Sequence, residues 1–307
     1  MSDLTDSDAD YVYAFEVAPD YRTGDKLCFA ACRSGLKRSD DSGVTWYNAY
    51  GTLGQEATAS TLAVVVSPDY SNEPLIVAGL TGGFLRSEDN CRRWAGIVLP
   101  SPSPTISAMV ISPSFSEDGL IFASSLKDGV FCSTDRGNSW VSWNFGLLDL
   151  NVLALAISPA FTSDATLLAG TESGIFRSTN GGRAWRELDL PSGFETVLAL
   201  SFSPNYSSNG VIYAGTESSG IFRSGSSGDA WERISGESLT GTIPSICPYG
   251  NGVILVHNGE VLISEDGNAF TLWQAEALED VEVTTLFVTK DLNTVLAGCA
   301  GGRLMRL

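Results

Sequence analysis

The sequence is poor in basic residues. It has 18 Lys and Arg against 36 Asp and Glu, which gives a formal net charge of −18. No run of basic residues interrupts this acidity. Because nucleic-acid backbones and anionic membranes would be repelled, the charge argues against both as partners.

Long apolar segments are also missing. No stretch of about 18 apolar residues occurs, and no basic segment followed by an apolar one stands at the N-terminus. The sequence therefore predicts no membrane insertion and no signal peptide, and it favours a cytoplasmic location.

Signals for metals and cofactors are missing too. The six cysteines are scattered without metal-ligand spacing and are expected to be buried free thiols: Cys28, Cys32, Cys91, Cys132, Cys247 and Cys299. The Gly-rich stretches, such as Asn180-Gly181-Gly182, lack the Lys-Ser/Thr and the following helix of a phosphate loop. No metal and no cofactor is predicted.

What the sequence has is a repeat. The octapeptide Ser39-Asp40-Asp41-Ser42-Gly43-Val44-Thr45-Trp46, here named the turn motif, returns five more times in degraded form. The further copies begin at Ser87, Ser133, Ser178, Ser224 and Ser264. Their last residues are Trp94, Trp140, Trp185, Trp231 and Phe270, at steps of 48, 46, 45, 46 and 39 residues from Trp46 onward. Such a period is typical of one supersecondary unit that repeats and shares its core with its neighbours.

Each turn motif lies inside a larger unit, which is clearest over 152–191. Four short runs rich in Val, Ile, Leu and Phe are separated by Gly, Pro, Ser and Asp, which predicts four strands and no sustained helix. The motif fits the hairpin between the third and fourth strands, where an Asp side chain bonds backbone amides. This role is assigned to Asp41, Asp89, Asp135 and Asp266. The Trp residues are expected to pack between units.

Repeated four-stranded units arranged radially are the blades of a β-propeller. The fold prediction is all-β: a polar segment over 1–10 and a single propeller over 11–307. Its blades are expected at about 11–55, 56–104, 105–149, 150–192, 193–240, 241–279 and 280–307. The seventh would have three strands, because the sequence ends where its turn motif would begin. Residues Ser2–Ala9 are a polar candidate for the missing edge strand, and strand addition by another chain is the other possibility.

The pattern Ser-x-Asp-x-Gly-x-x-Trp resembles the Asp-box, or BNR, repeat. The segment Gly-Ile-Phe-Arg-Ser-Thr-Asn-Gly-Gly-Arg-Ala-Trp at 174–185 is similar to that of Ycf48-type and BNR-like proteins. The resemblance covers nearly the whole chain and implies a propeller. It does not imply one function, because the repeat occurs in sialidases, other glycoside hydrolases, sorting receptors and photosystem assembly factors.

Sialidases that this repeat resembles place three arginines from separate blades on the substrate carboxylate. Here the arginines recur in phase just before the turn motif or at its expected place: Arg38, Arg86, Arg177, Arg223 and Arg306. A residue repeated in phase is more economically structural, for example in pairing with a neighbouring blade. The Arg-Ile-Pro signature of that family is also missing, so the likeness to sialidases is one of fold.

Alternating strand direction places the turn motifs and the repeated Ser-Pro turns on one face. The turns between second and third strands lie on the other face and differ from blade to blade, so we name it the variable face. Candidate binding residues there are Arg33, Lys127, Asp128, Glu172, Glu217 and His257. Glu172 and Glu217 occupy equivalent Gly-Thr-Glu-Ser turns and are the only catalytic candidates, as a carboxylate pair for glycoside hydrolysis. Duplication of the turn alone is the simpler explanation of this pair.

Aromatic residues after the fourth strands complete the candidates. Tyr50 and Trp143, with Tyr47 and Phe145, are interpreted as exposed aromatics that stack on a sugar or anchor a partner protein, but packing against the adjacent blade is the favoured alternative. The sequence favours a non-catalytic scaffold that binds a protein partner or assists complex assembly. The alternative is a carbohydrate-active propeller, either a glycoside hydrolase or lectin-like.

Overall fold

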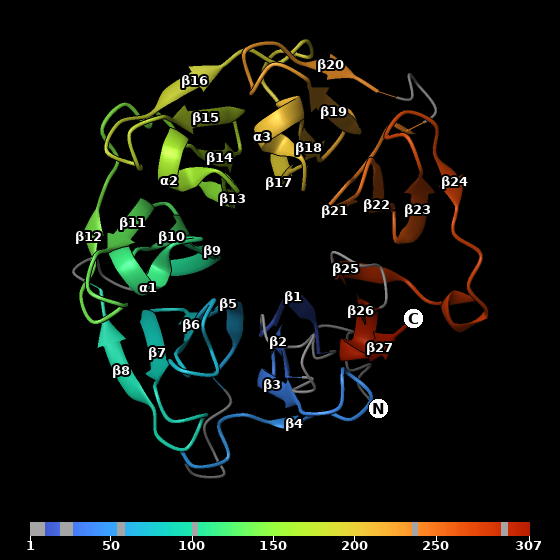
Figure 1. Ribbon diagram of the computed structural model, residues 1–307. Coiled ribbons are helices and arrows are strands. Elements are labelled where there is room, and N and C mark those ends of the chain that lie inside the picture. The colour runs from blue at the N-terminus through green and yellow to red at the C-terminus, as the bar shows by residue number, and fades with distance from the viewer. Residues whose placement is uncertain (1–9, 19–26, 54–58, 100–103, 235–238, 290–293) are drawn as a thin grey trace, which may run out of the picture.

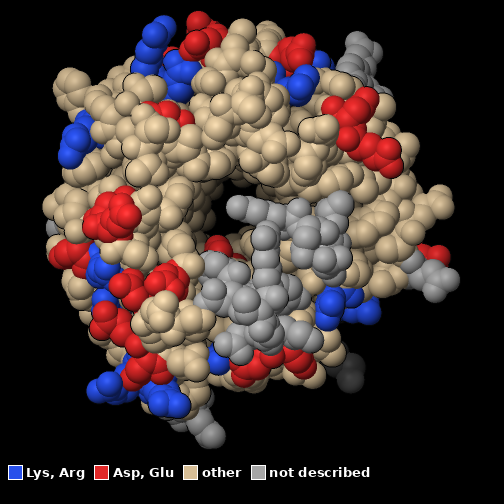
Figure 2. Space-filling view, viewed as in Figure 1, with Lys and Arg blue, Asp and Glu red and all other residues tan. Residues whose placement is uncertain are grey.

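The computed structural model describes residues 10–18, 27–53, 59–99, 104–234, 239–289 and 294–307. They form a ring of seven antiparallel sheets (Figure 1). The space-filling view shows an opening at the centre of the ring (Figure 2). The predicted all-β propeller with an incomplete last blade is therefore confirmed.

The strands of the first four blades are β1 Val12–Val17, β2 Cys28–Cys32, β3 Gly35–Ser39, β4 Tyr47–Asn48, β5 Thr61–Val66, β6 Ile76–Leu80, β7 Gly83–Ser87, β8 Ala95–Val98, β9 Thr105–Ile111, β10 Ile121–Leu126, β11 Gly129–Ser133, β12 Val141–Ser142, β13 Val152–Ile157, β14 Leu167–Thr171, β15 Ile175–Ser178 and β16 Arg186–Leu188. Those of the last three are β17 Val197–Phe202, β18 Ile212–Thr216, β19 Ile221–Ser224, β20 Glu232–Arg233, β21 Ser245–Tyr249, β22 Gly252–His257, β23 Glu260–Ser264, β24 Thr271–Leu272, β25 Val283–Val288, β26 Val295–Cys299 and β27 Leu304–Arg306. Short helices are α1 Phe115–Asp118, α2 Phe161–Asp164, α3 Tyr206–Asn209, η3 Glu276–Leu278 and η4 Ala300–Gly302.

Every blade is a meander in which each strand pairs with the next strand along the chain. The first strand of each blade lies next to the central opening, and the fourth strand lies at the perimeter (Figure 1). In the described chain, blade 7 consists of β25, β26 and β27 alone. The proposed edge strand Ser2–Ala9 lies outside the described residues.

Three of the repeated Ser-Pro turns contain a helical turn that the strand pattern did not predict. In α1 the Ser112 hydroxyl donates to Asp118 Oδ2 over 2.6 Å, and Asp118 Oδ1 accepts the Leu120 amide over 2.9 Å. Ser158 and Asp164 repeat this arrangement around α2. Side chains that bond the backbone locally stabilise a single turn of helix without helical periodicity in the sequence.

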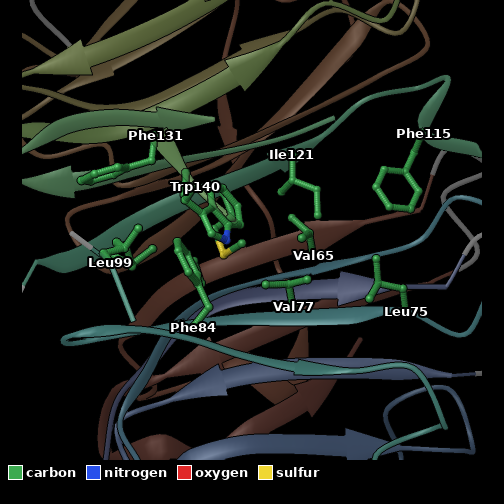
Figure 3. Packing of buried hydrophobic residues seen from close by; sticks show 13 residues of the cluster. Val65, Leu75, Val77, Phe84, Leu99, Phe115, Ile121, Phe131 and Trp140 are labelled. Carbon is green, nitrogen blue, oxygen red and sulfur yellow. The ribbon is translucent and has the colours of Figure 1, made fainter. Parts of the chain in front are cut away.

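The hydrophobic core lies between neighbouring blades. Trp140 of blade 3 stacks on Phe84 of blade 2, with ring centroids 4.1 Å apart. Leu99 and Phe131 belong to the same buried cluster (Figure 3). The Trp at the end of a turn motif therefore joins two blades, as the repeat predicted.

Blade 7 packs directly on blade 1. The Thr284 hydroxyl of β25 donates to the Val12 carbonyl of β1 over 3.1 Å. Leu296 of β26 is buried in one cluster with Val12 and Phe15. Figure 1 shows the sheet of β25–β27 between blade 6 and blade 1. The described residues thus close the ring by side-chain packing between its first and last blades.

Candidate functional site

The turn motifs share the face that carries α1, α2 and α3, on which acidic and basic side chains are intermixed (Figure 2). In the third copy, Ser133 Oγ accepts the Gly137 amide over 2.8 Å and donates to Asp135 Oδ1 over 2.9 Å. Asp135 also accepts the amide and the hydroxyl of Ser139, over 2.8 and 2.6 Å. The Trp140 indole donates to the Gly137 carbonyl over 3.2 Å. The polar groups of the motif therefore bond one another and hold the turn.

These bonds favour the ionised form of the Asp side chains. The Thr45 hydroxyl, the Thr45 amide and Ser39 donate to Asp41 and lower its pKa to about 2. The Asn268 and Ala269 amides lower the pKa of Asp266 to about 2 as well. An acid or base that works near neutral pH needs a pKa close to that pH, so both groups suit a structural role.

Three of the repeated arginines, Arg38, Arg86 and Arg177, pair with the next blade. Arg38 Nη1 donates to the Asn90 carbonyl over 3.0 Å, and Arg86 Nε donates to the Arg136 carbonyl over 2.8 Å. Arg177 Nη1 donates to the Ser227 carbonyl over 2.6 Å. All three acceptors occupy the fourth position of a turn motif. Each of these guanidinium groups joins its blade to the next one by a hydrogen bond. The three arginines therefore do not converge on one point, as arginines that bind a substrate carboxylate would.

Glu172 and Glu217 are both exposed. Asn151 Nδ2 donates to Glu172 Oε2 over 3.1 Å, and the carbonyl groups of Glu172 and Glu217 accept the hydroxyls of Thr196 and Thr242. The two turns thus have the same environment in consecutive blades. These contacts anchor the backbone of each turn and leave its carboxylate at the surface.

Two carboxylates that the sequence analysis missed hold the turns of the variable face. Glu195 is 9% exposed, and it accepts the Ser218 amide over 3.1 Å, the Ser218 hydroxyl over 2.8 Å and the Ser219 hydroxyl over 2.6 Å. Asp149 accepts the Ser173 amide over 3.0 Å in the preceding blade. Burial alone raises the pKa of Glu195. The hydrogen bonds from Ser218 and Ser219 lower the pKa by more than burial raises it, so the net shift is downward. In the sequence, the only feature that Glu195 and Asp149 share is their position at the end of a linker between blades.

The remaining turn candidates differ in their surroundings. Arg33 and Lys127 are exposed, and Asp128 is half-buried with its carbonyl accepting Asn144 Nδ2 over 2.9 Å. His257 Nε2 lies 2.9 Å from the Thr240 carbonyl and 3.2 Å from Asn258 Nδ2. These neighbours include no nucleophile for the imidazole to activate, so the contacts are those of a turn residue.

The expected exposure of the linker aromatics is wrong for Tyr50. Its side chain is 2% exposed, its hydroxyl lies 2.8 Å from Thr61 Oγ1, and its ring makes an edge contact with Trp94 of the next blade at 5.0 Å. Trp143 is half-buried beside Phe122, and the Arg183 guanidinium lies 5.5 Å from the centre of its ring. For Tyr50, the alternative of packing against the adjacent blade is the correct one.

Several large apolar side chains are exposed at the ends of the fourth strands and on the linkers that follow them. The exposed fractions are 85% for Val98, 80% for Phe145, 80% for Leu148 and 84% for Phe194. Val98 ends the fourth strand of blade 2, Phe145 and Leu148 follow the fourth strand of blade 3, and Phe194 lies on the linker between blades 4 and 5. We name them the linker residues.

The described residues contain no group of three or more His, Cys, Asp or Glu side chains placed to hold a metal ion. Their cysteines carry no disulfide, and burial raises the pKa of the Cys28 and Cys132 thiols to about 12. In the same part of the chain no helix has the length and apolar character needed to cross a membrane.

No protein-family model and no curated protein sequence matches the chain. Solved structures do resemble it. The extracellular domain of BT4673 from B. thetaiotaomicron is 14% identical, with a TM-score of 0.71 over 98% of this chain and 38% of that chain. The GH74 xyloglucanase from Xanthomonas campestris is 15% identical, with a TM-score of 0.76 over 96% of this chain and 51% of that chain. YCF48 bound to D1 peptide is 16% identical, with a TM-score of 0.71 over 97% of this chain and 93% of that chain.

The chain thus spans well under two thirds of the BT4673 and GH74 proteins and nearly all of the YCF48 structure. At these identities the likeness is one of fold. The chain shares the β-propeller architecture with a protein that binds a peptide and with a glycoside hydrolase.

Proposed function

We propose that the protein is a non-catalytic scaffold that binds a protein partner through its variable face and the adjoining linker residues. The observation that carries the proposal is the exposure of Val98, Phe145, Leu148 and Phe194, each at least 80% accessible. Aromatic side chains such as those of Phe145 and Phe194 are enriched at protein interfaces relative to the rest of the surface.

The contrast between the two faces supports this assignment. Polar groups of the turn motifs bond within the motif, and Arg38, Arg86 and Arg177 bond the next blade. On the variable face, Arg33, Lys127, Glu172 and Glu217 present different side chains to solvent. A repeated scaffold with unlike exposed turns can recognise one partner by an irregular pattern of charge. The similarity to YCF48 bound to D1 peptide agrees with a peptide-binding role, although it shows only the fold.

The test is retention of a partner by surface variants. The purified chain captures proteins from its host lysate at physiological salt, beside a variant with Phe145→Ser, Leu148→Ser and Phe194→Ser. A matched control carries Val44→Ser, which is 64% exposed and lies in the first turn motif, away from the linkers. We expect a stoichiometric partner that the control retains and the triple variant loses. Equal retention by both variants contradicts the proposal.

A carbohydrate-active propeller is the second candidate. The observation that favours it is the pair of exposed carboxylates, Glu172 and Glu217, in equivalent turns of consecutive blades. The GH74 xyloglucanase shows that this fold also occurs in glycoside hydrolases. Hydrolysis of any glycoside in a substrate screen, abolished by Glu172→Gln or Glu217→Gln, would favour this candidate over the scaffold.

A further inference from the structure

The boundaries between complete blades share one packing arrangement. Between blades 4 and 5, Trp231 is buried in one cluster with four side chains: Ile175, Leu188, Leu190 and Val197. Between blades 5 and 6, Phe270 packs on a cluster with Ile221, Ile234, Leu239 and Ile243. In each case the aromatic residue ends the turn motif of the later blade. The residues around it come from the third strand, the fourth strand and linker of the earlier blade, and the first strand of the later one.

The same positions recur between blades 6 and 7. Val261 corresponds to Ile175 on the third strand, and the Trp273 amide donates to the Val261 carbonyl over 2.9 Å, which places Trp273 opposite it. Ala275 lies in the linker, and Val283 begins β25. With Leu272 and Leu278 these residues line a groove of about 550 Å³. Within the described residues no turn motif fills this groove, because the sheet of blade 7 has three strands there.

The backbone edge beside this groove has a defined register. In complete blades, the residue three positions after the motif aromatic donates its amide to the third strand. Ala49 donates to Leu36, Trp143 to Val130 and Ile234 to Ile221, over 2.9, 2.9 and 3.1 Å. Ile221 pairs with Gly215 of its second strand, as Leu304 pairs with Gly298. The Leu304 carbonyl is therefore the equivalent acceptor on β27, and no fourth strand of the described chain pairs with β27.

The charge around the groove indicates which side chains an occupant should carry. Glu260, Glu279 and Asp280 line the groove and are exposed. Its lining contains no Lys or Arg. An occupant with Lys or Arg near its aromatic residue is therefore favoured over an acidic one.

We propose that the outer edge of blade 7 binds an extended segment of a partner polypeptide by strand addition. The segment runs antiparallel to β27, inserts an aromatic side chain beside Val261 and Trp273, and donates the amide three residues later to the Leu304 carbonyl. Lys or Arg side chains next to the aromatic residue face the acidic rim. Main-chain pairing supplies affinity in this mode of recognition, and the side-chain pocket supplies specificity. The inference rests on the proposed function in assuming a polypeptide partner, but it uses a surface other than the linker residues.

A peptide copied from the chain's own blade 4 tests this geometry. Residues 179–190 contain Trp185 between Arg183 and Arg186, and Leu188 stands three positions after the Trp. The fluorescein-labelled peptide is titrated with the full chain, and fluorescence anisotropy reports binding. Two matched control peptides carry Trp185→Ala, which removes the aromatic side chain, and Leu188→Pro, which removes the amide donor.

We expect saturable binding of the parent peptide and affinity that is about tenfold weaker, or lower still, for each control peptide. The protein variant Val261→Glu should lose binding, whereas Leu148→Glu at the linkers should keep it, with both melting as cooperatively as the parent. Equal binding of the three peptides, or no saturable binding, overturns the proposal. Binding that appears only after deletion of residues 1–9 also overturns it, because the edge would then be covered by the chain itself. None of these outcomes changes the result expected for partner retention through Phe145, Leu148 and Phe194. That experiment tests the proposed function separately.

Discussion

The face that carries the turn motifs and the side that carries the linkers belong to the same seven blades, but their side chains have different partners. Ser133 and Asp135 on the first bond within their own turn, and Arg86 bonds the next blade. Phe145 and Phe194 on the second are at least 80% exposed. The repeated residues are thus used by the fold, and the residues available for binding are those that do not repeat.

The largest effect that this comparison predicts is the loss of a motif aromatic. Trp231→Ala removes a buried ring between blades 4 and 5, and it should lower the free energy of unfolding by about 3–5 kcal/mol. Phe194→Ala, on an 84% exposed side chain, should change it by less than about 0.5 kcal/mol. Urea denaturation followed by circular dichroism measures both. Similar losses for the two variants would contradict the division of roles.

A smaller effect is expected from the motif serine. Ser133 is fully buried, and its hydroxyl accepts the Gly137 amide, so Ser133→Ala leaves a buried donor without a partner. The expected loss of unfolding free energy is about 1–3 kcal/mol. Ser163→Ala serves as the control, because Ser163 is exposed and its hydroxyl donates to Ala160 on the same face. If Ser163→Ala lowers the free energy of unfolding as much as Ser133→Ala, the hydroxyl in the turn motif has no larger role in stability than an exposed one.

The smallest effect concerns acid stability. The pKa of Asp41 is lowered to about 2, from about 3.9 in an unfolded chain. A depressed carboxyl pKa stabilises the folded state above the unfolded value, and this contribution is lost as pH falls from about 3.9 toward 2. Asp41→Asn should therefore flatten the decline of melting temperature between pH 4 and pH 2. A parallel decline in the variant would assign the acid sensitivity to other carboxylates.

The sequence predicted the parts of the structure that repeat. The phase of the turn motif located the blades closely, and β25 at Val283–Val288 lies at the start of the blade expected at 280–307. Local rules suffice for such elements, because alternation and turn residues act within one unit. The exposure of Tyr50 was not predictable in this way. Its hydroxyl contacts Thr61 and its ring contacts Trp94, both of which belong to the next blade.

The candidate site shows the same limit. The sequence identified Glu172 and Glu217 as turn residues, and both are exposed. It did not identify Glu195, because the hydrogen bonds that Glu195 accepts from Ser218 and Ser219 depend on how a linker passes over the following blade. The linker residues were also missed except Phe145, because exposure of an apolar side chain depends on packing between units. Geometry between repeats has no local signal in a single sequence.

The most direct test of the central claim is amide hydrogen exchange on the complex with the captured partner, compared with the chain alone. Our account predicts slower exchange over 143–150 and 191–196, with unchanged rates in the turn motifs at 39–46 and 133–140. Slower exchange confined to the turn motifs, with the linkers unchanged, would contradict it.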